Sequence, residues 1–304
     1  MKIAQRGRGR ELLQRGVEFE KKKLLTKIIK AMRTRDFLAA VACAAMMTAC
    51  NENTTDNTGV NVNDVTGEYA GYSVANSQFF TDMVSDKETV NVEAEGDESV
   101  KVTYVSGMFG EFTLSGCTVA KDGNGMKITG EGVTLMGMGE EKSEYAATIE
   151  AAIGANKATA EFAFTVPDVM GGTTIRFVQG TMPAALGAAG DYEGSLTLSV
   201  SGSEMGGVDT IGCHITRVSD ETVNIALDEF EAMGSMMFTL NCENIGVSGT
   251  DWSYTLSGEI DTMSGETEVT GTVSGTVTDG KAEITFTFRP GAMPMDVTAV
   301  FKSF

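Results

Sequence analysis

The chain contains a single histidine, His214, so any reaction that needs an imidazole base has one candidate residue. A Ser-His-Asp arrangement would have to be built around it, and the sequence has no G-x-S-x-G segment to supply the serine. His214 is out of phase with Ile211, Cys213 and Ile215, which alternate as the inner face of a strand would. We therefore expect His214 on the outer surface, without a catalytic role.

Paired carboxylates are the next residues that could do chemistry, because glycoside hydrolases use two of them. Adjacent pairs occur at Glu140 with Glu141 and at Asp228 with Glu229. In a chain with 42 acidic residues such pairs are expected on solvated loops. The sequence predicts no catalytic residues and no enzyme activity, with a glycan-acting enzyme as an alternative.

Metal ligands are the third possibility. The segment "KDGNGMK" at residues 121–127 has oxygen ligands but lacks the spacing of an EF-hand loop, so it predicts a turn. Methionine pairs near Met136, Ser235 and Met293 are of the type that binds Cu(I), although methionine also fills irregular gaps in a core. We predict no metal and no cofactor, and keep a methionine-based copper site as an alternative.

The pattern of residues near the N-terminus is typical of a targeting segment. Arg33 and Arg35 precede an apolar run over residues 37–47, far shorter than the roughly 20 residues that span a bilayer. This pattern predicts a signal peptide ending at residue 49. The basic stretch before Met32 makes the N-terminal charged region longer than that of a normal signal peptide. We therefore expect translation to begin at Met32.

The segment "MTAC", ending at Cys50, resembles the lipobox of bacterial lipoproteins. The resemblance implies that Cys50 is acylated and becomes the first residue, and that the acyl chains hold the protein at the cell envelope. That location would be the outer membrane, on its periplasmic or its external face. The polar "NENTTDNTG" that follows suits a disordered tether over residues 50–65.

The charge of the mature part limits the partners. Beyond residue 49 there are 11 basic and 38 acidic residues, a net charge of about −27. Such a surface repels phosphate backbones and anionic headgroups. Nucleic acid is therefore excluded as a partner, and contact with the membrane is expected only through the lipid anchor.

Three cysteines remain after the leader and the lipid site: Cys117, Cys213 and Cys242. Cys213 and Cys242 could pair in a disulfide, but each is in phase with apolar neighbours, where a free thiol behaves as a small buried hydrophobe. Free buried thiols are the favoured interpretation.

The mature chain repeats itself. Gly67 begins "GEYAGYSV" and Gly190 begins "GDYEGSLTLSV", an offset of 123, and similar offsets separate "FTL" at Phe112 and Phe238, "FAF" and "FTF" at Phe162 and Phe286, and Phe177 and Phe301. Nearly constant offsets along the chain indicate duplication. The sequence thus predicts two copies of one domain, at residues 66–180 and 190–304, joined by a linker at 181–189.

Each copy has the alternation of a β-protein. In the second copy about eight runs alternate apolar and polar residues, and little helical periodicity follows the leader. The glycines in "VTGTVSGTVT" suit a sharply bent strand. Eight antiparallel strands in about 115 residues predict a closed barrel or a sandwich.

These segments resemble the calycin-like β-barrel domain of bacterial envelope lipoproteins. The resemblance is carried by "GDYEGSLTLSV", "ETVNIALDEF", "MMFTLNCENIGV", "VTGTVSGTVTDGKAEITFTF" and "VTAVFKSF" in the second copy, and the first copy fits less closely. It implies an all-β fold with two tandem calycin-like (lipocalin-like) antiparallel barrels of about eight strands each.

Two functions of different classes fit such barrels. One is a structural or interaction protein whose barrels are filled and whose surfaces meet an envelope protein partner. The other is a carrier that binds a small apolar ligand inside a barrel. Large residues such as Phe238, Trp252, Phe286, Phe288 and Phe301 favour filling in the second copy, whereas the small residues of 144–164 predict more room in the first.

Overall fold

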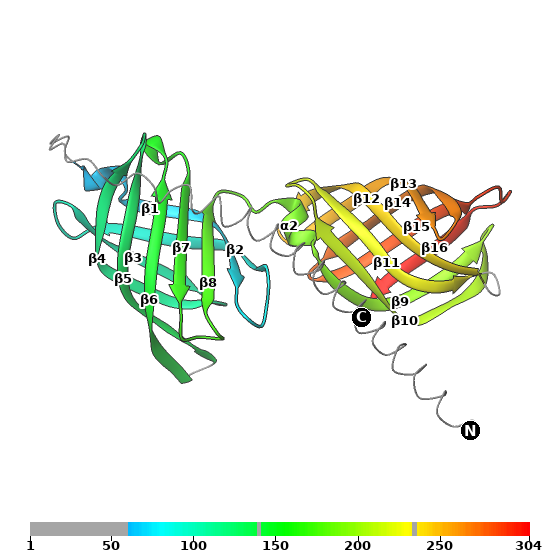
Figure 1. Ribbon diagram of the computed structural model, residues 1–304, viewed down its shortest axis with the longest axis horizontal. Helices are drawn as coiled ribbons and strands as arrows, with labels where there is room; N and C mark the ends of the chain where they lie inside the picture. The colour runs from blue at the N-terminus through cyan, green and yellow to red at the C-terminus, as the bar shows by residue number, and fades with distance from the viewer. Residues whose placement is uncertain (1–59, 139–140, 233–235) are drawn as a thin grey trace, which may run out of the picture. The chain divides into compact units, whose positions relative to one another are not determined.

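The computed structural model describes residues 60–138, 141–232 and 236–304, and Cys50 lies outside these residues. It shows two closed antiparallel β-barrels of eight strands each, one after the other along the chain (Figure 1). The predicted all-β fold with two tandem barrels is confirmed. No helix within the described ranges is long and apolar enough to cross a bilayer.

The first barrel is a simple meander in which each strand pairs with the next and β8 closes on β1. Its strands are β1 (Gly67–Asn76), β2 (Met83–Ala94), β3 (Ser99–Ser106), β4 (Gly110–Asp122), β5 (Gly125–Met138), β6 (Glu141–Ile153), β7 (Ala160–Val166) and β8 (Thr173–Gln179). A short 3-10 turn, η2 (Ala155–Lys157), joins β6 to β7.

The second barrel repeats this order, with β16 closing on β9. Its strands are β9 (Gly190–Val200), β10 (Ser203–Arg217), β11 (Thr222–Ala232), β12 (Met236–Thr250), β13 (Ser253–Ser264), β14 (Thr267–Thr278), β15 (Lys281–Pro290) and β16 (Val297–Ser303). Alternating apolar residues face inward as predicted, and each barrel has its own core cluster.

The glycines of β14 lie where the strand needs them. Val269, Val273 and Val277 are buried, and Gly271 shares their inward face. A Cβ at Gly271 would lie 2.0 Å from the carbonyl oxygen of Thr287 on β15. Only glycine permits this close approach of two backbones.

One end of each barrel is covered by a short helical segment. In the first barrel this is the 3-10 helix η1 (Val62–Asp64), and in the second it is α2 (Ala184–Ala188), which packs against β10, β12 and β13 (Figure 1). Residues 181–189, predicted as a linker, therefore also contribute Leu186 and its neighbours to the second core. We call the covered end of each barrel its closed end and the opposite end its open end.

Equivalent tyrosines in the two barrels bond to the chain just before the first strand. Tyr69 Oη donates a hydrogen bond to the carbonyl oxygen of Val65 at 2.6 Å, and Tyr192 Oη donates to that of Ala188 at 3.0 Å. Tyr192 lies 123 positions after Tyr69, and Ala188 lies 123 positions after Val65. The duplication thus includes the closed end as well as the strands.

One match between the two copies differs in the structure. Phe177 on β8 pairs with Phe162, whereas its counterpart Phe301 on β16 pairs with Ile284. The match of Phe162 with Phe286 is therefore displaced by two residues, a shift that leaves both on the inward face because side chains alternate with a period of two.

Trp252 was expected to help fill the second barrel, and this is wrong. It lies in the two-residue turn between β12 and β13, where Asp251 and Trp252 both have positive φ, at 54° and 60°. This is the backbone of a tight hairpin turn that usually takes Asn-Gly. The indole is only partly buried and packs against the core.

Candidate functional site

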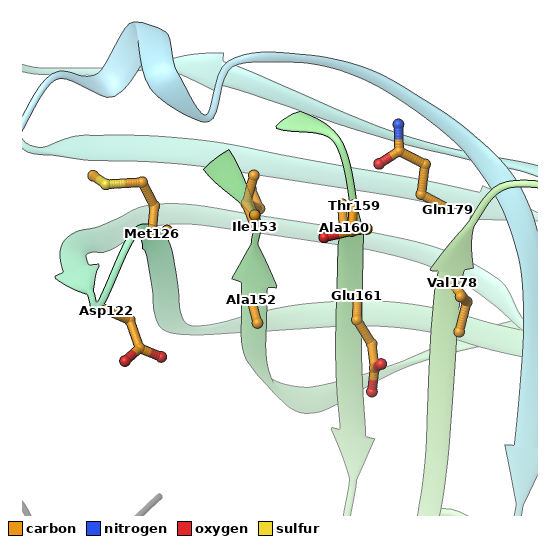
Figure 2. A pocket seen from close by; sticks show the side chains of 11 residues that line it. Asp122, Met126, Ala152, Ile153, Thr159, Ala160, Glu161, Val178 and Gln179 are labelled. Atoms are coloured by element: carbon orange, nitrogen blue, oxygen red, sulfur yellow. The ribbon is translucent and has the colours of Figure 1, made fainter. Parts of the chain in front are cut away.

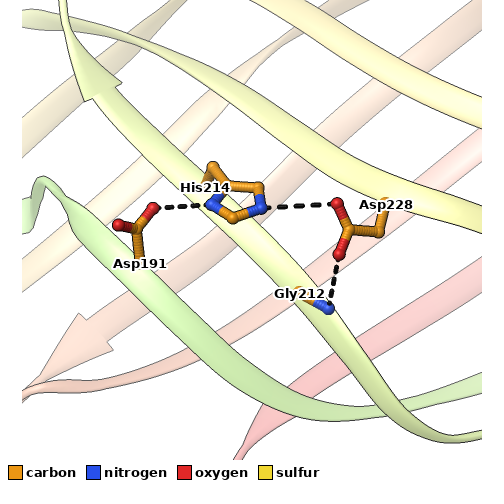
Figure 3. Close-up of polar contacts among 4 residues, drawn as sticks. All are labelled: Asp191, Gly212, His214 and Asp228. Atoms are coloured by element: carbon orange, nitrogen blue, oxygen red, sulfur yellow. Dashed lines mark hydrogen bonds and ion pairs between the residues drawn. The ribbon is translucent and has the colours of Figure 1, made fainter.

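The single histidine forms a cluster with two aspartates on the outside of the second barrel (Figure 3). His214 Nδ1 lies 2.6 Å from Asp191 Oδ1, and Nε2 lies 3.3 Å from Asp228 Oδ1. The amide of Gly212 donates to the other Asp228 oxygen at 3.2 Å. The His214 side chain is 45% exposed, which confirms its predicted place on the outer surface.

This cluster joins strands and lacks the parts of a catalytic triad. Both ring nitrogens of His214 face carboxylates, and the cluster contains no hydroxyl or thiol that could act as a nucleophile. The hydrogen bond to Asp191, followed by that to Asp228, raises the pKa of His214 above its usual 6.5. Its contacts with Asp191 and Asp228 link β10 to β9 and to β11.

The stability of the second barrel should therefore depend on pH through His214. A raised folded-state pKa means that the contribution is complete below about pH 6.5 and is lost as pH rises through the folded value. Because the side chain is nearly half exposed, we expect less than about 1 kcal/mol. Urea unfolding followed by Trp252 should separate wild type from His214→Gln at about pH 5.5 and bring them together at about pH 9. An equal gap at both values would contradict this role.

The three cysteines of the described chain are free and buried, as the sequence favoured. Burial raises the pKa of Cys213 and of Cys242 to about 12, and also raises that of Cys117. Thiols held in the neutral form are poor nucleophiles and poor metal ligands. These cysteines are core residues.

The interiors of both barrels are filled by side chains. In the first barrel Tyr104 stacks on Phe164 with ring centroids 5.1 Å apart, Phe112 lies 5.0 Å from Phe164, and all three are fully buried. The expectation of more room in the first copy is therefore not met. Aromatic side chains from β3, β4 and β7 are buried in the same core cluster as small residues such as Ala147 and Ala151 of β6.

Two hollows lie on the surface at the closed end of the first barrel. Figure 2 shows one of about 470 Å³, lined by Asp122, Met126, Gln179 and residues of β6 and β7. It is open to solvent, and its second carboxylate, Glu161, is paired with Arg176. None of the residues that line this hollow is aromatic.

A polar cluster lies inside the open half of the first barrel. We call Ser73, Ser85, Glu88, Tyr104 and Ser106 the inner polar cluster. Glu88 Oε1 accepts hydrogen bonds from the hydroxyls of Ser85 and of Ser106, the latter at 2.8 Å. Tyr104 Oη donates to Ser73 Oγ at 2.9 Å. The backbone amides of Met108 and Phe109 in turn donate to Ser106 Oγ, each at 3.1 Å, which ties the cluster to the β3–β4 turn.

Glu88 is an unusual residue for a barrel interior. Its side chain is on the face of Val90 and Val92, only 7% of the residue is exposed, and within the described chain it has no ion-pair partner. Its oxygens meet only hydroxyl groups. Burial, with a smaller contribution from the nearby Glu88 charge, raises the pKa of Tyr104, so the phenol stays a neutral donor.

The second barrel provides an internal comparison. Gly71 pairs with Glu88 as Gly194 pairs with Ile211, which fixes the equivalence of the two strands. Polar positions of the first barrel correspond in this way to aliphatic ones: Ser73 to Leu196, Ser85 to Val208, Glu88 to Ile211, Tyr104 to Leu227 and Thr173 to Val297. The same fold forms without the inner polar cluster, so the fold does not require it.

Exposed methionines surround the open ends. We call Met83, Met108 and Met170 of the first barrel and Met205, Met236, Met237, Met263 and Met295 of the second the methionine rims; each is between 39% and 56% exposed. Every open-end hairpin except β5–β6 carries at least one of them. Of the fourteen exposed large apolar residues in the described chain, twelve lie in the open halves, so apolar surface is concentrated at one end of each barrel.

The other residues singled out in the sequence as possible metal ligands or carboxylate pairs do not come together in one site. The "KDGNGMK" segment forms the turn between β4 and β5, as predicted. Met136 is half-buried against the first core, Met293 lies in the β15–β16 loop, and Glu140 and Ser235 fall outside the described residues. The inner polar cluster was missed, although Glu88 in phase with the valines of "ETVNV" was a signal that could have found it.

Comparison with known proteins agrees with this architecture. The calycin-like beta-barrel domain matches residues 65–180 and again 188–303, so the chain belongs to the calycin-like β-barrel family. No curated protein matches.

Two of the solved structures that match this chain are the following. One is a putative outer membrane protein from Bacteroides fragilis, 33% identical, with a TM-score of 0.67 over 80% of this chain and 99% of that one. The other is a protein of unknown function from Nostoc punctiforme, 10% identical, with a TM-score of 0.22 over 79% of this chain and 96% of that one. The match to the first therefore extends over almost the whole of that protein, and the second is too distant to support an argument.

Proposed function

We propose that this protein is a non-catalytic, lipid-anchored component of the bacterial cell envelope that binds a protein partner through its methionine rims. The observation that carries the proposal is the contrast between filled interiors and exposed methionines gathered at the open ends. Methionine is flexible and polarisable, and it suits surfaces that adapt to an apolar partner. Exposed apolar residues concentrated on one face mark interaction sites.

The geometry of the anchor favours a protein partner over the anchoring membrane. The chain enters the first barrel through η1 at the closed end, so a tether from Cys50 reaches the barrel there. The first methionine rim lies at the opposite end. The acidic surface, with a net charge of about −27 beyond residue 49, also disfavours anionic headgroups.

The envelope location rests on the lipobox-like segment and on likeness to the Bacteroides fragilis protein described as a putative outer membrane protein. Lipidation at Cys50 follows from the same segment. A Cys50→Ala variant should leave the membrane fraction of the native host.

The interaction can be tested by photo-crosslinking in the native host. A photoreactive amino acid would replace Met108, Met237 or Met263 at the rims, and Asp279 or Gly123 at closed-end turns as matched controls. We expect one and the same partner protein to be captured from the rim positions and not from the control positions. Equal capture from both ends, or none from the rims, would overturn the proposal.

A further inference from the structure

We propose that the open mouth of the first barrel binds the ammonium group of a small organic amine, with Glu88 as its counter-ion. This inference goes beyond the partner binding proposed above and concerns the inner polar cluster and the side chains next to it. The second barrel, which lacks the cluster, should not bind the amine.

The first step concerns charge. Glu88 is a carboxylate held inside a barrel, where an unpaired charge is costly. Ser85 and Ser106 both donate to Oε1, and the groups around the carboxylate are neutral hydroxyls, so none of them supplies a positive charge. A primary ammonium has three N–H donors and a full positive charge, so it supplies what this carboxylate lacks.

The second step comes from the duplicated barrel. Ile211 occupies the position of Glu88, with Leu196 and Val208 where the first barrel has Ser73 and Ser85. Because aliphatic residues at these positions support the same barrel, the cluster adds a folding cost without an architectural benefit. A ligand that pairs with Glu88 accounts for its presence in one copy only.

The third step concerns the surroundings of the carboxylate. Thr134 is fully buried in the same half of the barrel, and its Oγ1 has no hydrogen-bond partner. Tyr104 belongs to the inner polar cluster, and its ring centroid lies 5.6 Å from that of Phe112. Aromatic faces beside a carboxylate attract organic cations, and the free hydroxyl offers another acceptor.

The fourth step concerns the rest of the ligand. Phe79 in the β1–β2 loop is 75% exposed, Met108 in the β3–β4 turn is 56% exposed, and the amide of Met108 bonds to the cluster through Ser106. An ammonium at Glu88 therefore places its substituent beside exposed apolar side chains. The ligand class is an amine with an aliphatic or aromatic body.

The test uses n-octylammonium, n-octanol and n-octanoate, each titrated into the mature protein and followed by amide chemical shifts. Wild type should show saturable shifts at β2 and β3 with n-octylammonium and not with n-octanoate. Glu88→Gln should weaken n-octylammonium binding by about tenfold or more, because it removes the charge and keeps the shape. Glu93→Gln, on the exposed face of the same strand, should bind as wild type does.

Ser85→Ala is the second variant, since it leaves the charge in place and removes one hydroxyl. It should weaken binding less than Glu88→Gln does, which keeps the test informative if the glutamine variant is unstable. Equal binding to wild type and to Glu88→Gln, or equal binding of n-octanol and n-octylammonium, would overturn the proposal. Neither result would alter the crosslinking pattern at the methionine rims.

Discussion

Replacing Ile211 by glutamate should destabilise the second barrel by about 3 kcal/mol or more, although the first barrel tolerates Glu88 at the equivalent position. The reason is the missing hydroxyl groups. Leu196 and Val208 stand where Ser73 and Ser85 stand in the first copy, so the new carboxylate would be buried with no donor nearby. A buried charge without a partner is among the most destabilising single changes.

The measurement is denaturant unfolding followed by Trp252, the single tryptophan, which belongs to the second barrel. Thr216→Glu, an exposed position on the same strand, is the matched control and should change stability by less than about 0.5 kcal/mol. The first barrel should stay folded in both variants, because its core cluster is separate. Similar stability of Ile211→Glu and Thr216→Glu would contradict the claim that the interior of the second barrel cannot accommodate a buried carboxylate.

Replacing Phe164 by alanine should destabilise the first barrel by about 3–5 kcal/mol. Its ring stacks on Tyr104 and lies 5.0 Å from Phe112, and it is fully buried, so its loss opens a cavity that rigid neighbouring strands cannot close. Hydrogen exchange of the Val102 and Leu114 amides reports on this barrel, which has no tryptophan. Phe79→Ala, on an exposed loop, should leave the exchange rates almost unchanged.

A different outcome for Phe164→Ala would count against a filled barrel. If the interior normally held a ligand, trimming Phe164 would enlarge a space that already exists and would cost little stability. Exchange rates in Phe164→Ala equal to those in Phe79→Ala would indicate that the interior already contains such a space.

The architecture could be predicted from the sequence because its signals are local and repeated. Alternation in segments such as "AEITFTF" predicts strands with one inward face, and constant offsets between the copies predict two domains. The outward position of His214 and the burial of Cys213 follow from the same alternation. The strand assignments and the positions of these two side chains depend only on residues a few positions apart.

The features that were missed depend on contacts between distant parts of the chain. Trp252 seemed to continue a strand pattern, but the turn at Asp251 takes it out of the barrel. Residues 181–189 have no helical periodicity, and α2 forms because Leu186 and its neighbours pack into the end of a barrel. The inner polar cluster joins Ser73, Glu88 and Ser106 from three strands, so no single segment contains it.

Xenon binding tests the central claim, that these barrels are filled and act through their ends, most directly. Xenon enters dry apolar cavities and not well-packed cores. Under xenon pressure, the inward methyl groups of Leu114, Ile128 and Leu240 in the wild-type protein should show no saturable shifts, whereas Phe164→Ala, as positive control, should show them at Leu114. Saturable xenon shifts at these methyl groups in the wild type would reveal an interior cavity and contradict the account.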